Sequence, residues 1–331
     1  MAEIVGKTRP VGHRMKEIVK RVARYENSFL ILILIVVVAT IAVITKGKTI
    51  SRLNFSNILS QISSRGIASV GQFFVILTAG IDLSVGGLAA LTMCVGAELM
   101  SGKAGLAAMT MGIAVILLVG FGIGSANGLL VSRINIPPLI VTLSMWLISE
   151  AGTLQILGGR AILTNLPPSL AFFGQANVAG VPVSFIIFVA VVVVAYFILN
   201  HTTFGRSVYA VGGSPVSAWL SGINTRNIIF SVYAISGFLA ALASLVVVAR
   251  TMTASAEVIG PLEFDTITAV CIGGVSLAGG RGSLIGGVIG VIILGIISNG
   301  MNLMGIPIAF QSIVKGAIII TAVTIDTMRR R

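Results

Sequence analysis

Ser28–Thr45 reads SFLILILIVVVATIAVIT and contains no charged residue. In a helix that rises about 1.5 Å per residue, this run extends over roughly 27 Å, which is enough to cross the hydrocarbon core of a bilayer. The basic segment before it, residues 1–27, lacks the small-residue cleavage site of a signal peptide, and the apolar run that follows is full length. We therefore predict that Ser28–Thr45 is a membrane-spanning helix.

Apolar segments of similar length continue to the C-terminus. Hydrophobic residues make up 56% of the 331-residue chain and charged residues 10%, whereas a soluble domain carries about 25% charged residues. We place further spans at 57–79, 83–100, 104–130, 138–157, 182–199, 227–249, 265–279, 283–303 and 307–327. The sequence thus predicts an all-α polytopic membrane protein with about ten transmembrane helices, in a single transmembrane domain over residues 28–328.

Small residues are frequent within these spans, as in 69–71, 120–128 and 286–295. Lipid provides no hydrophobic force between helices, so small residues that let two backbones approach are a main source of helix association in membranes. We expect a closely packed helical bundle rather than a set of isolated anchors.

The charged residues follow the spans. The formal net charge is +12. If the N-terminus is cytoplasmic, most Lys and Arg residues fall on the cytoplasmic side, as the positive-inside rule requires, although Lys46, Lys48 and Arg52 depart from it. Because the charge flanks apolar spans rather than forming a separate basic face, we expect no nucleic-acid partner. We predict a basic cytoplasmic segment over 1–27 and two cytoplasmic termini.

The longest polar passage between spans is His201–Asn224, HTTFGRSVYAVGGSPVSAWLSGIN, which resembles a loop. Within it, Ser214 is a predicted N-cap and Pro215 a first helical residue. Gly222 stands where a left-handed C-terminal residue belongs. These signals predict a helix of two turns, Pro215–Ser221, on the cytoplasmic side.

This short helix has an apolar face. Val216, Trp219 and Leu220 follow the i, i+3, i+4 spacing of one helix face. A helix of this length is not stable alone in water, so it must dock against something. One interpretation is a helix that lies on the lipid surface or on its own neighbours, and the other is a coupling helix that inserts into a soluble partner subunit.

Asp82 is the most conspicuous ionisable residue near a span, because it stands just before Ser84, Gly86 and Gly87. Intramembrane acids are costly and often mark proton or ion sites. A carboxylate at a helix N-terminus, however, is stabilised by free N–H groups and by the helix dipole. We favour the helix cap over the ion site.

Other polar side chains within the spans have two interpretations. They could hydrogen-bond a hydroxylated solute along a translocation pathway, or they could join neighbouring helices. The candidates for the pathway are Gln72, Asn127, Asn299 and Asn302. Two charged residues within spans, Glu150 and Lys315, could also pair with each other.

A weak internal similarity links Gly80–Gly87, GIDLSVGG, with Gly280–Gly287, GRGSLIGG. Repeats of this kind are common in transporters, where the pathway lies at the interface between the copies. Chance similarity within low-complexity apolar sequence is the alternative.

Several kinds of chemistry are not supported by the sequence. It has no P-loop signature GxxxxGK[ST], so the chain does not bind ATP by that route, and Arg281 is interpreted as a loop charge rather than a phosphate ligand. Cys94 and Cys271 lie far apart in apolar segments, and no cluster of metal-ligating residues exists. No nucleophile and base can be assembled either. We expect a non-catalytic chain without a cofactor or metal of its own.

Four motifs together resemble the permease subunits of ribose-type bacterial ABC importers. They are Gly80–Gly87, Thr203–Gly213 (TFGRSVYAVGG), Leu220–Asn224 (LSGIN) and Ile272–Ser283 (IGGVSLAGGRGS). The similarity runs from about residue 50 to the end. Each motif alone is weak, but the set is specific. The pair Ser214–Pro215 departs from the family, where many relatives have Asn followed by an acidic residue.

The resemblance implies a roughly ten-helix bundle similar to the vitamin B12-type importers, in the bacterial inner membrane. It implies a dimer with a second permease copy or homologue, an ATPase subunit that holds ATP and Mg, and an extracytoplasmic binding protein that delivers a sugar or related polyol. The coupling surface would include Gly205, Arg206, Pro215, Trp219, Leu220 and Gly222, while Asp82, Ser84, Gly86, Gly87 and Arg281 would form structural motifs. The alternatives are a branched-chain amino acid permease and a secondary transporter driven by H⁺ or Na⁺.

Overall fold

The computed structural model describes residues 28–103, 105–158, 160 and 164–328. The predicted basic segment over residues 1–27 lies outside this described part. The longer helices are α2 (Ser28–Ile44), α3 (Arg52–Leu77), α4 (Val85–Met100), α5 (Leu106–Ser132), α6 (Pro138–Leu157), α8 (Val183–His201), α9 (Thr203–Gly213), α11 (Thr225–Thr251), α13 (Leu262–Ile272), α14 (Leu284–Leu303) and α15 (Ile308–Met328). The short elements are η1 (Lys48–Ile50), η2 (Pro168–Ala171), α7 (Phe172–Gln175), β1 (Asn177–Val178), β2 (Val181–Pro182), α10 (Pro215–Leu220) and α12 (Ala256–Ile259).

The protein is a mostly helical, polytopic membrane protein. Within the described residues, 6 helices are long and apolar enough to cross a membrane: α5, α6, α8, α11, α14 and α15. The helices α2 and α4 are apolar but shorter. The 26-residue helix α3 carries many polar residues, including Arg65, and α13 has only 11 residues. Each of the ten predicted spans overlaps one helix, but length and composition alone support six of these helices as membrane spans.

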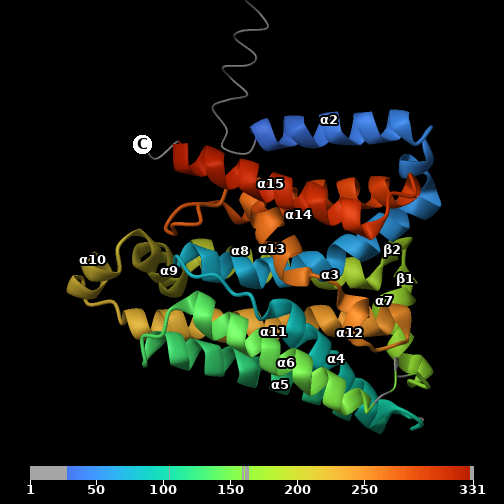
Figure 1. Cartoon of the computed structure of the whole chain (residues 1–331), viewed down its shortest axis with the longest axis horizontal. Coiled ribbons are helices and arrows are strands. Elements are labelled where there is room, and N and C mark those ends of the chain that lie inside the picture. The colour runs from blue at the N-terminus through green and yellow to red at the C-terminus, as the bar shows by residue number, and fades with distance from the viewer. Residues whose placement is uncertain (1–27, 104, 159, 161–163, 329–331) are drawn as a thin grey trace, which may run out of the picture.

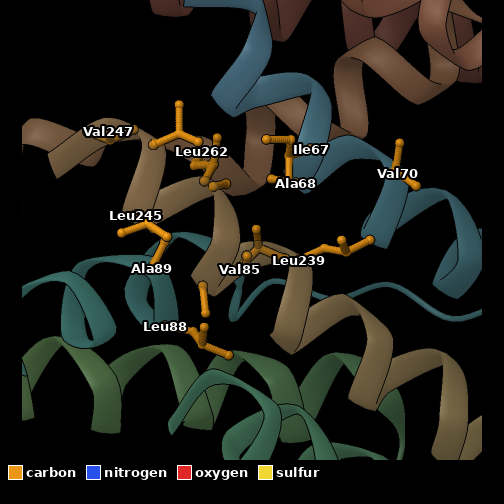
Figure 2. Close-up of a cluster of buried hydrophobic side chains, with 14 of the residues drawn as sticks. Ile67, Ala68, Val70, Val85, Leu88, Ala89, Leu239, Leu245, Val247 and Leu262 are labelled. Atoms are coloured by element: carbon orange, nitrogen blue, oxygen red, sulfur yellow. The ribbon is translucent and has the colours of Figure 1, made fainter. Parts of the chain in front are cut away.

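The helices run roughly along the long axis of the molecule, with α11 inside the bundle (Figure 1). Helix α11 packs against α3, α4 and α5. In Figure 1, α9 and α10 lie at one end of the bundle, and the antiparallel β1–β2 hairpin lies with α7 and α12 at the other. Figure 2 shows the apolar core that these helices share, where Ile67 of α3, Leu88 of α4, Leu245 of α11 and Leu262 of α13 face one another.

The predicted close packing through small residues is confirmed between α5 and α11. A Cβ atom added to Gly124 would lie 2.5 Å from the backbone oxygen of Tyr233 and 2.8 Å from Gly237 Cα. Gly120 is equally restricted, because its added Cβ would overlap Ala241. The two backbones therefore touch along this stripe, and a side chain on either helix would separate them.

We expect Gly124→Ala to destabilise the bundle by about 1–3 kcal/mol, the usual cost of overpacking a tight contact. The matched control is Gly122→Ala on the same helix, where an added Cβ meets nothing within 4 Å. Because alanine favours helix over glycine, the control should leave the thermal midpoint in detergent unchanged or raise it. Equal midpoints for the two variants would contradict the proposed backbone contact.

Two predicted boundaries are wrong. Residues 203–213, expected to be part of a loop, form helix α9. In the predicted span 265–279, the helix ends at Ile272, and residues 273–283 are irregular. Gly274, Gly279, Gly280 and Gly282 in that segment have positive φ angles, which other residues rarely adopt.

Candidate functional site

The local signals that predicted α10 are confirmed. Ser214 is the N-cap and its Oγ accepts a hydrogen bond from Ser217 N at 3.2 Å. Pro215 follows as the first helical residue. Gly222 adopts a φ of +83°, which a left-handed C-terminal residue requires. The chain itself therefore fixes the length and direction of this short helix.

Helix α10 presents an apolar face that no other part of the described chain covers. Trp219 is 66% exposed, Val216 68% and Leu220 73%, whereas Ala218 on the opposite face is buried. Beside this face lies a surface hollow, which is lined by Arg133, Trp219 and residues 222–226. An exposed tryptophan next to two arginines at the hollow is typical of an interaction surface rather than of a free solvent-facing helix.

Helix α9 connects α10 to the bundle. Thr202 caps it by accepting a hydrogen bond from Gly205 N at 3.1 Å. Val208 and Val211 are fully buried, and Arg206 points to the exposed side. Gly205 is buried against the last turn of α8, because an added Cβ would overlap Leu199. The predicted coupling residue Gly205 therefore holds α9 on α8, while Arg206 is accessible from outside.

Close contacts join α9 to the end of α3 and to the irregular segment between α13 and α14. An added Cβ on Gly212 of α9 would overlap both Leu77 O and Gly280 N, and Tyr209 Oη of α9 donates a hydrogen bond to Gly282 O at 3.0 Å. Gly280 N in turn donates a hydrogen bond to Leu77 O at 2.9 Å. Because no flexible side chain separates the backbones at Gly212, a displacement of α9 must move the end of α3 and the segment before α14.

The two similar glycine motifs occupy equivalent places. Ser84 is the N-cap of α4, and Ser283 is the N-cap of α14. The first motif follows α3 along the chain, and the second follows α13. The two segments also touch, since Gly279 packs against Ala79. Arg281 is exposed in the second segment, as expected for a loop charge.

Asp82 lies at the centre of a buried hydrogen-bond network. Its Oδ1 accepts hydrogen bonds from Ser84 N at 3.0 Å and Ser84 Oγ at 2.6 Å, and its Oδ2 accepts one from Ser236 Oγ at 2.8 Å. Asn127 Nδ2 donates to Ser84 Oγ at 2.9 Å. The Gln72 amide pairs with the Asp82 backbone, donating to its oxygen at 3.0 Å and accepting from its nitrogen at 3.2 Å. The network ties together α3, α4, α5 and α11.

The cap of α4 thus lies two residues after the predicted one. Asp82 binds the N–H of Ser84, and Ser84 rather than Asp82 is the N-cap of α4. The next two predicted motif residues allow close approach to other helices. Gly86 leaves room for the side chain of Glu263, and Gly87 for the backbone of Trp146.

The four candidate pathway residues separate into two groups. Gln72 and Asn127 belong to the Asp82 network, and Asn299 forms a reciprocal amide pair with Asn54 at 2.9 and 3.0 Å. These three therefore make the helix–helix hydrogen bonds that were the alternative interpretation. Asn302 borders a cavity and accepts a hydrogen bond from Gln311 at 2.8 Å.

This polar cavity has a volume of about 730 Å³ and lies at the β1–β2 end of the bundle, opposite α10. Its walls come from the first half of α3, the loop around β1 and the last turn of α11. Uncharged polar side chains on these walls include Ser56, Asn57, Ser60, Gln61, Gln175 and Asn177. The volume lies within the usual range of about 300–1,000 Å³ for small-molecule sites.

The sequence interpretation missed an ion cluster beside this cavity. Arg65 Nε lies 2.9 Å from Asp265 Oδ2, and Lys315 Nζ lies 2.6 Å from Asp265 Oδ1. Lys315 pairs with this residue rather than with Glu150, the partner considered from sequence. The sequence did hold a signal for this cluster. Arg65 and Lys315 both fall within predicted spans, and cations inside a membrane require a nearby acid.

Residues 54–323 match the family model described as "Branched-chain amino acid transport system / permease component". The ribose import permease protein RbsC of Escherichia coli K12 is 38% identical over 303 residues, which cover 91% of this chain and 92% of the relative. The fructose import permease protein FrcC of Rhizobium meliloti is 35% identical, covering 91% of this chain and 85% of the relative.

The D-allose transport system permease protein AlsC of Escherichia coli K12 is 36% identical, with 89% of this chain and 90% of the relative covered. No solved structure matches the chain significantly. The family match spans most of the chain, and so do the relatives above 30% identity. The chain belongs to the branched-chain amino acid transport system permease component family.

Proposed function

We propose that the chain is the permease subunit of an ATP-driven ABC importer that moves a sugar or related polyol across the bacterial inner membrane. The exposed apolar face of α10 carries this proposal, because it is joined through α9 to the end of α3 and to the segment between α13 and α14 by direct backbone contacts. Such a face needs a partner, and such contacts can transmit the partner's movement. The names of the relatives, which are import permeases for ribose, fructose and D-allose, support the solute class.

The proposed partners follow from this assignment. The α10 face and the adjoining hollow dock on a separate ATPase subunit, which holds ATP and Mg. Arg133 and Arg226 at the hollow favour acidic groups on that subunit. A second permease copy or a homologue completes the membrane part, and an extracytoplasmic binding protein delivers the solute to the end of the bundle that holds the polar cavity.

The proposed topology has ten transmembrane helices, similar to the vitamin B12-type importers, with both termini in the cytoplasm. Besides the six long apolar helices, α2, α3, α4 and α13 would complete the set. In Figure 1 the end of α15 lies on the α10 side of the bundle, and α2 starts near the middle and runs away from α10, which supports two termini on the side of the ATPase.

The proposed mechanism is alternating access. ATP binding draws the two ATPase subunits together and moves the α10 helices with them. Through Gly212, this movement shifts the end of α3 and the glycine-rich segment between α13 and α14. The helices then exchange between two arrangements, one open toward the binding protein and one open toward the cytoplasm. Such a two-state element, biased by nucleotide, is the physical requirement for coupling.

A tagged copy purified from its native membrane tests the assignment. We expect an ABC ATPase to co-purify. The reconstituted complex, given its binding protein, should accumulate a sugar in proteoliposomes only when ATP is supplied. Transport by the permease alone, without ATP, would overturn the proposal.

A branched-chain amino acid is the second candidate solute, because the description of the matched family names that class. The serine, asparagine and glutamine side chains that line the cavity favour a sugar, because they can hydrogen-bond its hydroxyl groups. Uptake of leucine but of no sugar by the same proteoliposomes would reverse this choice.

Trp219→Ala is expected to weaken assembly with the ATPase by about 30-fold, because truncating a large aromatic anchor at an interface commonly costs about 2 kcal/mol or more. The permease should stay folded, since the side chain makes little contact with its own bundle. The control is Phe121→Ala on α5, another exposed aromatic far from α10. Affinity measured by titrating the ATPase onto the immobilised permease checks this, and full affinity of the Trp219 variant would remove the coupling role of α10.

A further inference from the structure

The polar cavity at the β1–β2 end is lined by two arginines. Among the described residues that line it, the charged ones are Arg65 and Arg250, and none is acidic. Like charges repel each other, and in a partly enclosed space the repulsion is strong because the low dielectric screens little. An anion in the cavity would therefore compensate the charge of the two arginines.

Arg65 uses only part of its guanidinium group in its ion pair. Its Nε lies against Asp265, and Asp265 is shared with Lys315, so one carboxylate faces two cations. The Arg65 side chain is 28% exposed and lines the cavity, so an acceptor bound there can reach the guanidinium group.

Arg250 also lines the cavity, at the last turn of α11. It forms no ion pair with any residue in the described part of the chain. Its backbone is held in place, since Gln175 Nε2 donates a hydrogen bond to Arg250 O at 2.9 Å. Two guanidinium groups that come from fixed helices and face one space match the planar, multidentate recognition of carboxylates and phosphates.

Combining these charges with the uncharged lining, we infer that the cavity binds a polyhydroxylated solute that carries an acidic group, a carboxylate or a phosphate. Arg65 and Arg250 hold the acidic group. The serine, asparagine and glutamine side chains of α3 and of the loop around β1 hydrogen-bond the hydroxyl groups. This inference rests on the proposed import function and specifies its solute class as sugar acids or sugar phosphates rather than neutral sugars alone.

Binding to the full-length permease in lipid nanodiscs tests this without the ATPase or the binding protein. The probes are D-glucose, D-glucuronate and D-glucose 6-phosphate, which share the sugar and differ in the acidic group. We expect the acid or the phosphate to bind at least about 10-fold more tightly than glucose, because hydrogen bonds between charged groups are worth about twice as much as neutral ones. The tighter of the two identifies the group, and its affinity should fall as salt rises.

Variants localise the site. Arg250→Gln removes a cation without breaking an ion pair, and it should lower the affinity for the charged probe about 10-fold while leaving glucose unaffected. Arg65→Lys keeps the charge beside Asp265 but loses the guanidinium fork, so it should also weaken binding of the charged probe. The control is Lys103→Gln, an exposed cation at the same end of the bundle that does not line the cavity.

Equal affinity for glucose and its charged relatives would overturn the inference, as would an unchanged affinity of Arg250→Gln. Equally tight binding of inorganic phosphate alone, competitive with the sugar derivatives, would reduce the site to an unselective anion site and would also overturn it. These results leave the importer assignment intact, because co-purification of the ATPase and ATP-dependent uptake are measured separately.

Discussion

Gly212→Ala is expected to abolish ATP-driven uptake while leaving the ATPase bound. The added methyl group would overlap the backbone oxygen of Leu77 and the backbone nitrogen of Gly280. Neither atom belongs to a flexible side chain, so α9 must move away from the bundle. The exposed face of α10 lies on the far side of Ser214 and does not depend on this contact. The partner should therefore still bind, but its movement should no longer reach α3 and the segment between α13 and α14.

The neighbouring residue supplies the control. Gly213 is also the glycine of a helix end, but a Cβ added there meets nothing within 4 Å. Gly213→Ala makes the same chemical change one residue along and should retain uptake. The measurements are sugar accumulation in proteoliposomes, ATPase turnover and co-purification for both variants. If Gly212→Ala transports as well as Gly213→Ala, the junction does not carry the coupling.

The ends of α10 could be predicted because their signals are local. A serine N-cap, a proline at the first helical position and a left-handed glycine act through neighbouring residues. The same logic failed for α9. Gly205, Gly212 and Gly213 resemble the punctuation of a loop, yet Gly205 and Gly212 lie within a helix and allow backbones to touch. Sequence does not separate a glycine that breaks a helix from one that lets a helix approach its neighbour.

The missed parts of the site depend on contacts between distant segments. Asp265 pairs with Arg65 of α3 and Lys315 of α15, and only the fold brings these three together. The end of α13 at Ile272 has a similar cause, because the irregular segment after it is supported by the hydrogen bond from Gly280 N to Leu77 O. The polar cavity likewise combines α3, the β1 loop and α11. Periodicity reports which residues share a face, but not what that face meets.

Asp82→Ala is expected to destabilise the permease by about 3 kcal/mol, because it leaves the hydrogen-bond donors of Ser84 and Ser236 without their buried acceptor. Asp82 is 1% exposed, so water does not replace the lost carboxylate. The matched control is Glu98→Ala, which removes an acid from an ion pair with Arg160 whose side chains are 44% and 50% exposed. Such exposed pairs contribute about 0–1 kcal/mol. Thermal unfolding in detergent distinguishes the two.

Asp82→Asn separates a structural role from an ion-coupling role. The Asn oxygen can still accept the two hydrogen bonds from Ser84, and the Ser236 hydroxyl can turn to accept from the Asn amide. If the carboxylate only holds the network, this variant should keep most of its stability and its ATP-driven uptake. A proton- or sodium-driven transporter would instead need the ionisable group itself. Loss of uptake in Asp82→Asn, with assembly and ATP turnover intact and with wild-type uptake responding to a proton gradient, would favour that mechanism. We expect the opposite because every carboxylate oxygen of Asp82 already has a donor within the protein.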